Sequence, residues 1–557
     1  MLSPLVLSFT LAGVAASPRG AVASAHPMAS EVGASVLRAG GNAVDAAVAT
    51  AFALGVVEND KSGLGGGGFA LVYVARERKV HAIDFREVAP LAATSDMFVR
   101  DGKPEPRLAQ EGALAVAVPG AVKGYAELSR RFGKKPLPSL VEPAARIAES
   151  GFALGLKQLE DATVKLECLR ADAAASREFL APGEGGAPLP RQPGERLVRR
   201  DLARTLRLLG KDPEAFYRGP LARKIAAAVR ARGGILTEED LARYRVRERE
   251  PLRGRYRGLE VVSMGPPSAG GAIVIGLLQA LEGSDPGVGG YRPEPWLHRL
   301  AEIERRLYAR RAAVLGDPDF VPGARAAAEE IASEAYARQV AAAVGERATP
   351  SSGVAPPRAK GENTTHVSVI DADGNAVALT TTVNGYYGSC LVVPGTGILL
   401  NDQMDDFDLA PGVANQFQLV GAGGANAVAP GKVPLSSMSP VLLLDGDGRA
   451  LLAVGSPGGS TIPSTVAQVV VNVVDHRMRL DDALSTPKIH HQWMPDRIIA
   501  EPWALDADTA AALRSRGHAI DVRPRPFGNP QAVMVDRKTG WRIGASDGRG
   551  DGAPAVP

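Results

Sequence analysis

A threonine stands where a flexible segment meets a predicted strand. Residues 348–363 are rich in Pro, Ser and Gly without an apolar period, which predicts a flexible segment, and an apolar strand pattern follows Thr364. If the chain were cut between Asn363 and Thr364, Thr364 would offer a hydroxyl nucleophile and a free α-amine with a pKa near 8. Such an amine is a suitable general base at neutral pH. The alternatives are a structural strand threonine and, at residues 363–365, a glycosylation acceptor.

The glycine run GLGGGG at residues 63–68 has the spelling of a dinucleotide-binding loop. That loop requires a strand before the glycines and a helix after them, so that the helix N-terminus meets the pyrophosphate. Here a predicted helix precedes the run, and a β-rich stretch at residues 69–75 follows it, with a return strand at 79–85. The run therefore does not indicate a nucleotide cofactor.

Cysteine and histidine give no pattern for a metal. Cys168 and Cys390 are the only two cysteines, and neither has the local Cys or His spacing of a zinc site. His490 and His491 are adjacent, and adjacent residues point in different directions on a strand or helix. We therefore expect no metal, no structural zinc and no disulfide framework.

The composition is that of an ordinary globular protein. Of the 557 residues, 45% are apolar and 22% are charged, which excludes disorder, collagen and coiled coil. Only 5% are aromatic, and 64 Lys and Arg balance 61 Asp and Glu to a net charge of +3. This charge cannot form the basic field that phosphate neutralisation requires, so we expect no nucleic acid partner.

The N-terminus carries an unbroken small and apolar run at residues 5–16. The run is too short to span a bilayer and resembles a secretory signal, although the usual basic start is missing. We therefore predict a signal peptide over residues 1–17 and a periplasmic or secreted protein with no membrane span after its removal. The alternative is a buried first helix.

The elements that must position Thr364 change in type along the chain. Asn42 is a predicted N-cap for an almost wholly apolar helix at 43–57, which must lie between other layers. Residues 140–350 read as mostly helical, with the clearest segments at 272–281, 296–315 and 326–344. Beyond Thr364, hairpins are predicted at 367–382, 441–454 and 532–545, with an apolar helix at 466–474. This pattern indicates antiparallel sheets covered by helices, and we therefore predict an α+β fold, a four-layer αββα sandwich.

Seven sequence blocks along the chain resemble the γ-glutamyltranspeptidase family of N-terminal nucleophile hydrolases. The resemblance spans roughly residues 20 to 550, and such long, ordered blocks are far more specific than one short motif. The blocks are GNAVDAAVA at 41–49, GLGGGG at 63–68, DFREVAP at 84–90, TTH at 364–366 with DGNAVA at 373–378, GILLNDQMDDF at 397–407, PLSSMSP at 434–440 and GSPGGS at 455–460.

The resemblance implies a precursor that cleaves itself between Asn363 and Thr364. Residues 18–363 would form a large subunit and residues 364–557 a small catalytic subunit, held together as a heterodimer. Thr364 would then attack the amide of glutathione and other γ-glutamyl compounds. The acyl group would pass to water, an amino acid or a dipeptide acceptor, without a cofactor.

The resemblance also assigns roles to individual residues. The backbone N–H groups of Gly458 and Gly459 match the oxyanion hole, and the hydroxyl of Thr382 matches the group that binds the nucleophile. A γ-glutamyl group has an α-carboxylate and an α-ammonium, so its pocket needs both signs of charge. The carboxylate side matches Arg86, Ser436 and Ser437, and the ammonium side matches Asn384, Gln403 and Asp406.

Two positions depart from some relatives of the family. Phe417 stands where some relatives have Tyr, before a Gly- and Ala-rich stretch at 420–430 that resembles a lid, so it cannot donate a hydroxyl hydrogen bond. Asn363 stands in place of Gln. Two further functions stay open. One is a glutaryl or cephalosporin-type acylase on the same scaffold, against which Asp406 argues. The other is an inactive γ-glutamyl peptide-binding protein, against which Thr364, Thr382 and the Gly458–Gly459 pair argue.

Overall fold

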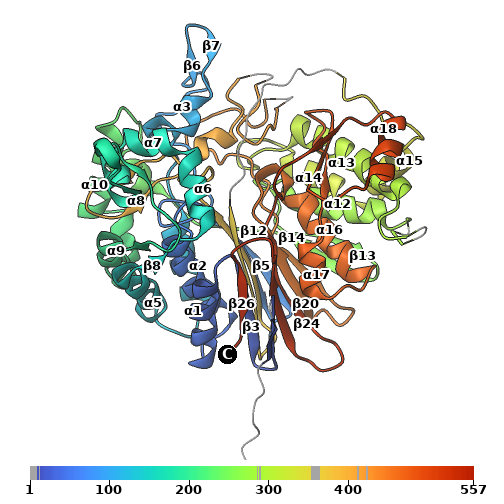
Figure 1. The fold of residues 1–557 in the computed structure, drawn as a ribbon, viewed down its shortest axis with the longest axis horizontal. Coiled ribbons are helices and arrows are strands. Elements are labelled where there is room, and N and C mark those ends of the chain that lie inside the picture. Colours follow the sequence, from blue (N-terminus) through green and yellow to red (C-terminus); the bar gives the residue numbers. More distant parts are fainter. Residues whose placement is uncertain are drawn as a thin grey trace, which may run out of the picture.

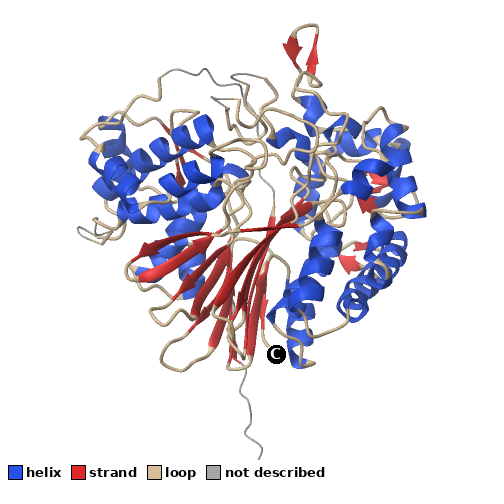
Figure 2. Cartoon of the chain, turned by 180° about the vertical axis from the view of Figure 1, so that it is seen from behind, coloured by secondary structure: helices blue, strands red, loops and turns tan. Residues whose placement is uncertain are grey.

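Two antiparallel sheets lie face to face, and each is covered on its outer face by helices (Figures 1 and 2). The computed structural model describes residues 9–11, 13–284, 286–287, 290–352, 364–410, 413–421 and 424–557. The predicted segment at 348–363 therefore lies largely outside the described residues. The predicted α+β fold, a four-layer αββα sandwich, is confirmed.

The first sheet has seven strands and carries Thr364 at its centre. Its strands, in spatial order, are β12 (Arg247–Arg249), β5 (Lys79–Asp84), β4 (Gly67–Val74), β16 (Ala376–Thr382), β15 (Thr365–Asp371), β3 (Gly20–Ser24) and β26 (Ala553–Ala555). Thr365 pairs with Thr381 across β15 and β16. In an antiparallel pair this register places Thr364 at the same end of the sheet as Thr382.

The second sheet has eight strands and packs against the first. Its strands, in spatial order, are β1 (Phe9–Leu11), β2 (Val14–Ser17), β25 (Arg542–Ser546), β24 (Gln531–Val535), β20 (Ala450–Gly455), β19 (Val441–Leu444), β14 (Leu259–Ser263) and β13 (Leu252–Tyr256). The hairpin of β13 and β14 lies in a region predicted to be mostly helical. Its turn is Arg257 and Gly258, both at positive φ, and this two-residue turn is the local hairpin signal.

The helices beside the seven-stranded sheet surround α2, which is buried along almost its whole length. Asn42 and Asp45 cap α2 reciprocally, as expected for an N-cap at Asn42. This layer contains α1 (Pro27–Arg38), α2 (Ala43–Val57), α4 (Ala121–Phe132), α5 (Leu137–Ser150) and α9 (Arg200–Lys211), with α3 (Arg107–Gln110), α6 (Leu156–Val164), α7 (Leu166–Ala171), α8 (Ala173–Phe179), α10 (Pro220–Arg230) and α11 (Glu238–Arg243) further out.

The second helical layer covers the eight-stranded sheet. It contains α12 (Gly270–Leu281), α13 (Glu294–Val314), α14 (Ala324–Ile331), α15 (Glu334–Ala342), α16 (Ile462–Val474), α17 (Leu480–Ser485) and α18 (Ala507–Ser515). The helix predicted at 326–344 is two helices, because the Ser333 hydroxyl accepts from the Tyr336 N–H and starts α15.

The N-terminal segment predicted as a signal peptide contributes two strands to the second sheet. Val14–Ser17 (β2) pairs with β25, and the side chains of Ala15 and Ser17 are buried. In the described part of the segment, Phe9–Leu11 and Val14–Ser17 are strands rather than the buried helix that was the alternative. The signal peptide stays a prediction, and a cut after Ser17 would remove β2 from the sheet.

Cys168 and Cys390 form a disulfide, with their Cα atoms 5.9 Å apart. The expectation of no disulfide framework did not foresee this single bond. The two residues are 222 positions apart, so local spacing carried no signal, and only the fold brings α7 beside the segment before β17 (Val392–Val393).

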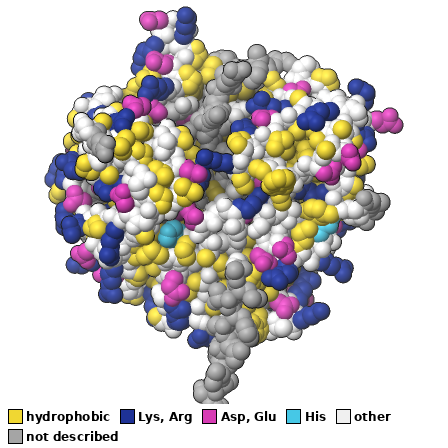
Figure 3. Space-filling view, viewed as in Figure 1, with side chains coloured by type: hydrophobic (Ala, Val, Ile, Leu, Met, Phe, Trp, Pro, Cys, Tyr) yellow, Lys and Arg dark blue, Asp and Glu magenta, His cyan; other side chains and the backbone are white. Residues whose placement is uncertain are grey.

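The surface shown in Figure 3 mixes positive and negative side chains without a large field of one sign. Over the described parts of the chain, every helix is either too short or too polar to serve as a membrane span. Within the same residues, no group of three or more His, Cys, Asp or Glu side chains is arranged to hold a metal ion.

Candidate active site

Thr364 is fixed between the two central strands and the end of α2. Its hydroxyl donates to the Thr382 hydroxyl, with 3.4 Å between the oxygens, and both side chains are buried. Thr382 Oγ1 also accepts from the Asn384 N–H at 2.8 Å. The next residue, Thr365, donates to the Glu58 carboxylate at the end of α2 at 2.5 Å. These contacts hold the start of β15 in one place.

A glycine turn lies against Thr364 from the second sheet. Gly458 and Gly459 follow β20 and have φ values of +134° and +53°, which favour glycine. Thr461 closes the turn, because its N–H and its hydroxyl both donate to the Gly458 carbonyl. The chain then enters α16, whose N-terminal dipole is positive. Exposed N–H groups at a helix start are suited to stabilising an oxyanion.

A narrow pocket of about 20 Å³ lies on one side of Thr364. Arg86 and Asp406 form a buried ion pair in its wall. Burial raises the pKa of Asp406, and the Arg86 guanidinium opposes that shift. Gln403 donates to the same carboxylate at 2.8 Å. The pocket therefore holds one positive and one negative group within reach of the same bound molecule.

Several buried polar atoms around this pocket lack a hydrogen-bond partner among the described residues. They include Arg86 Nε, Ser437 Oγ and Gln403 Oε1. An unpaired buried polar group costs free energy, so these atoms favour a polar ligand. Arg86 and Ser437 could donate to a carboxylate, and Gln403 could accept from an ammonium.

The other two residues predicted to bind the substrate, Ser436 and Asn384, make hydrogen bonds to the surrounding backbone. Ser436 Oγ accepts from the Met438 N–H at 3.0 Å and so caps the local turn, and Ser436 also lines the pocket. Asn384 lines the pocket at φ +79° and donates to the Asp402 carbonyl at 3.1 Å. Both residues are therefore positioned by the backbone around them.

Phe417, just before the predicted lid stretch at 420–430, covers the glycine turn. A Cβ atom on Gly459 would lie 2.3 Å from Phe417 Cδ1, so the ring packs directly on that glycine. Gln492 donates to the Phe417 carbonyl at 3.1 Å and fixes the backbone. The ring is buried in the wall of the narrow pocket even without the hydroxyl of a Tyr.

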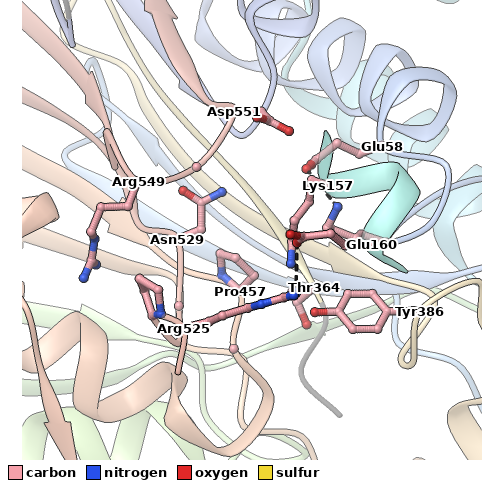
Figure 4. A pocket seen from close by; sticks show the side chains of 15 residues that line it. Glu58, Lys157, Glu160, Thr364, Tyr386, Pro457, Arg525, Asn529, Arg549 and Asp551 are labelled. Carbon is pink, nitrogen blue, oxygen red and sulfur yellow. Dashed lines mark hydrogen bonds and ion pairs between the residues drawn. The ribbon is translucent and has the colours of Figure 1, made fainter. Parts of the chain in front are cut away.

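A wider pocket of about 310 Å³ opens on the other side of Thr364 (Figure 4). Lys157 and Glu160 reach it from α6, and Arg525 reaches it from the loop before β24. Arg525 pairs with Glu160 at 2.9 Å, and Lys157 Nζ lies 5.4 Å from the centre of the Tyr386 ring. Thr364 lines both pockets.

All the described residues predicted for the site lie in or beside these two pockets; Asn363 lies outside the described residues. The wide-pocket residues Lys157, Tyr386 and Arg525 were not predicted, because they lie outside the quoted sequence blocks. Glu87 was also missed, although it follows Arg86 directly. Its carboxyl is buried, which raises its pKa to about 8.

Two stacked antiparallel sheets with a threonine at the head of a central strand define the class of N-terminal nucleophile hydrolases. The family model for Gamma-glutamyltranspeptidase matches residues 29–556. The chain therefore belongs to the γ-glutamyltranspeptidase family, and it is an enzyme of this family.

Individual relatives fall into two groups of activities. The chain is 41% identical over 524 residues to the "Glutathione hydrolase proenzyme" of Pseudomonas sp. (strain A14), covering 93% of this chain and 89% of that protein. It is 38% identical to the "Acylase ACY 1 proenzyme" of Pseudomonas sp. (strain V22), covering 99% and 96%. The crystal structure of cephalosporin acylase from Bacillus halodurans superposes with a TM-score of 0.84 at 29% identity, covering 100% and 99%.

Proposed function

We propose that this chain is a self-cleaving γ-glutamyltransferase and glutathione hydrolase that uses Thr364 as its nucleophile. The observation that carries the proposal is the placement of Arg86 and Asp406 in one narrow pocket beside Thr364. A γ-glutamyl group presents one carboxylate and one ammonium. Arg86 with Ser437 suits the carboxylate, and Asp406 with Gln403 suits the ammonium. Binding of this zwitterion would replace the direct Arg86–Asp406 pair.

Self-cleavage would begin with attack of Thr364 Oγ on the carbonyl carbon of Asn363. The peptide C–N bond breaks as an ester to Thr364 forms, and the proton from the hydroxyl passes to the amine. Water then hydrolyses the ester, which leaves a carboxylate on Asn363 and a free α-amine on Thr364. That amine is the general base for turnover.

In turnover, the hydroxyl of Thr364 attacks the γ-carbonyl of the donor. The α-amine takes the hydroxyl proton and gives it to the departing amine, and a γ-glutamyl ester remains on Thr364. Gly458 and Gly459 would donate N–H groups to the tetrahedral oxyanion. Thr382 keeps the nucleophile aligned through its hydroxyl, which Asn384 fixes in turn.

The wide pocket is our proposed route for the leaving group and for the acceptor. It faces Thr364 opposite the γ-glutamyl pocket and carries the partly exposed cations Lys157 and Arg525. A carboxylate on an amino acid or dipeptide acceptor would pair with these cations. Water would use the same route in hydrolysis.

After cleavage, residues 18–363 and 364–557 would stay together as a heterodimer, because β15 and β16 lie between large-fragment strands β3 and β4. We also propose export to the periplasm or the medium. The disulfide supports this location, because disulfides persist in oxidising compartments.

An acylase is the second candidate, because relatives with that name share the scaffold. A glutaryl side chain lacks the ammonium, and Asp406 would then be a buried charge without its partner. The presence of both Asp406 and Gln403 favours the γ-glutamyl donor.

The test compares wild-type protein with Thr364→Ala on a reducing denaturing gel. The wild type should give a small fragment of 194 residues, roughly 20 kDa, whose N-terminus is Thr364. Thr364→Ala should stay one chain without activity toward a γ-glutamyl anilide. Thr539→Ala, in the β24–β25 turn, is the control and should behave as the wild type. Processed, active Thr364→Ala protein would refute the proposal.

A further inference from the structure

The disulfide joins the two parts of the chain that self-cleavage would separate. Cys168 lies in α7, before the proposed cut at residues 363 and 364, and Cys390 lies after it. These are the only cysteines in the sequence, so no alternative pairing exists within the chain. Both side chains are buried, with exposed fractions of 7% and 2%.

The segment that carries Cys390 also forms a wall of the active site. Asn384 lines the narrow pocket and Tyr386 lines the wide pocket, six and four residues before Cys390. Asn384, Tyr387 and Cys390 have positive φ values of +79°, +57° and +58°, a conformation that L-residues adopt only when their surroundings hold them.

The large fragment holds this segment by main-chain hydrogen bonds as well as by the disulfide. The Tyr387 N–H donates to the Asp60 carbonyl at 2.8 Å, and the Gly112 N–H donates to the Ser389 carbonyl at 2.9 Å. The Tyr387 ring packs on Phe179 of α8, with ring centres 5.1 Å apart. The disulfide therefore fixes one end of a strained pocket wall against the other fragment.

We propose that Cys168–Cys390 is an interchain bond of the mature enzyme, which keeps the two fragments covalently joined after cleavage and positions the wall from Asn384 to Cys390. The proposal rests on the proposed self-cleavage. Cleavage would then create the catalytic amine of Thr364 without allowing the fragments to part.

The bond can form and break by thiol–disulfide exchange through a cavity beside it. Both cysteines line this cavity of about 380 Å³, together with the ion pairs of Arg107 with Glu111 and Arg232 with Asp172. Formation converts two protein thiols and one small disulfide, such as oxidised glutathione, into the protein disulfide and two small thiols. Reduction is the reverse exchange with two thiols.

The first experiment runs alkylated protein, purified from an oxidising compartment, on denaturing gels with and without dithiothreitol. Without reductant the processed protein should run as one species of about the full mass of 58.0 kDa, and with reductant as two fragments. Cys168→Ser should give two fragments in both lanes. Two fragments from the wild type without reductant would overturn the proposal. One species in both lanes would instead refute self-cleavage.

If the chain is not cut, a count of reactive thiols still tests the disulfide. Denatured, unreduced protein should react with no thiol reagent, and reduced protein should show two thiols. Two reactive thiols before reduction would refute the bond whether or not the chain is cut.

The positioning role is tested by urea inactivation of the processed enzyme. The midpoint should fall on addition of dithiothreitol, and Cys390→Ser without reductant should match the reduced wild type. The KM for a γ-glutamyl anilide should rise in both, because Asn384 loses one anchor of its segment. An unchanged midpoint and KM after complete reduction would overturn the positioning role. Reduction of the wild type avoids dependence on the folding of the variant.

Discussion

The two pockets that Thr364 lines differ in how deeply their charged side chains are buried. The narrow pocket has buried walls, and its two charged groups, Arg86 and Asp406, are paired with each other. The wide pocket has charges of both signs, and Glu58 and Lys61 in its wall are buried, but its cations Lys157 and Arg525 are partly exposed, with side chains 39% and 62% accessible. Buried charges discriminate strongly between ligands, whereas exposed pairs contribute little. The structure thus favours a strictly selected donor and loosely selected acceptors.

The largest expected effect tests the donor side. Asp406→Asn should lower kcat/KM for a γ-glutamyl anilide by about 30-fold to several thousand-fold, because removal of one partner of a buried charge pair costs about 2 to 5 kcal/mol. A glutaryl anilide, which lacks the ammonium, should lose little. Asp408→Asn is the matched control, since that carboxylate bonds to Asn426 instead. An unchanged ratio between the two substrates would remove Asp406 as the ammonium partner.

In the proposed mechanism the glycine turn stabilises the oxyanion in both self-cleavage and turnover, so its disruption should slow both. Gly459→Val would place a Cβ against the Phe417 ring and would disfavour the φ of +53°. Displacement of an oxyanion donor costs about 3 to 4 kcal/mol, or roughly two to three orders of magnitude in rate.

Cleavage on a reducing gel and anilide turnover would measure the two steps. Gly459→Val combined with Phe417→Ala relieves the contact with the ring but not the backbone restriction, and it should stay slow. Full activity in folded Gly459→Val protein would contradict the oxyanion assignment.

The preference for a γ-glutamyl over a glutaryl donor should also depend on pH. Burial raises the pKa of Asp406 above its ordinary value of 3.8. As the pH falls through that raised pKa, Asp406 gains a proton and its attraction for the substrate ammonium is lost. The ratio of kcat/KM for γ-glutamyl over glutaryl anilide should therefore fall on the acid side, at a pH above 3.8. Protonation of the Thr364 amine affects both substrates and cancels in the ratio. A ratio that stays constant over this range would show that the titrating group does not contact the ammonium.

The smallest effect is expected on the acceptor side. Lys157→Ala and Arg525→Ala should each raise the KM of a dipeptide acceptor about 1.4- to 5-fold, since exposed ion pairs are worth about 0.2 to 1 kcal/mol. Hydrolysis without acceptor should change little. Arg537→Ala, which lines a different cavity, is the control. If hydrolysis fell as much as transfer, Lys157 and Arg525 would act on the donor rather than on the acceptor. The two pockets would then not differ in their selectivity as proposed.

Much of the fold could be predicted because its signals are local. The N-cap at Asn42 and the turns of the hairpins after Thr364 are set by nearby residues, and the structure has α2, β15 and β16 there. The hairpin of β13 and β14 was missed in a helical region. Its two-residue turn is formed by Arg257 and Gly258, which is a weaker signal than Asp-Gly.

The candidate site could be predicted only where the sequence blocks extend. The blocks identified Arg86, Asp406 and the glycine turn, which the fold brings together. They could not identify Lys157 and Arg525, because these residues lie on α6 and on a distant loop and reach the same pocket only in the folded chain. The disulfide was also beyond local reasoning, because contact between Cys168 and Cys390 depends on the packing of α7 on the segment before β17.

The central claim is that the hydroxyl of Thr364 carries the γ-glutamyl group during turnover. The most direct measurement is rapid acid quenching during turnover of a γ-glutamyl anilide, followed by mass spectrometry of the reduced and digested small fragment. If Thr364 is the nucleophile, the peptide beginning at Thr364 gains the mass of one glutamyl group and loses it when an acceptor dipeptide is added. A glutamyl group on any other residue, or steady turnover with the Thr364 peptide unmodified, would contradict it.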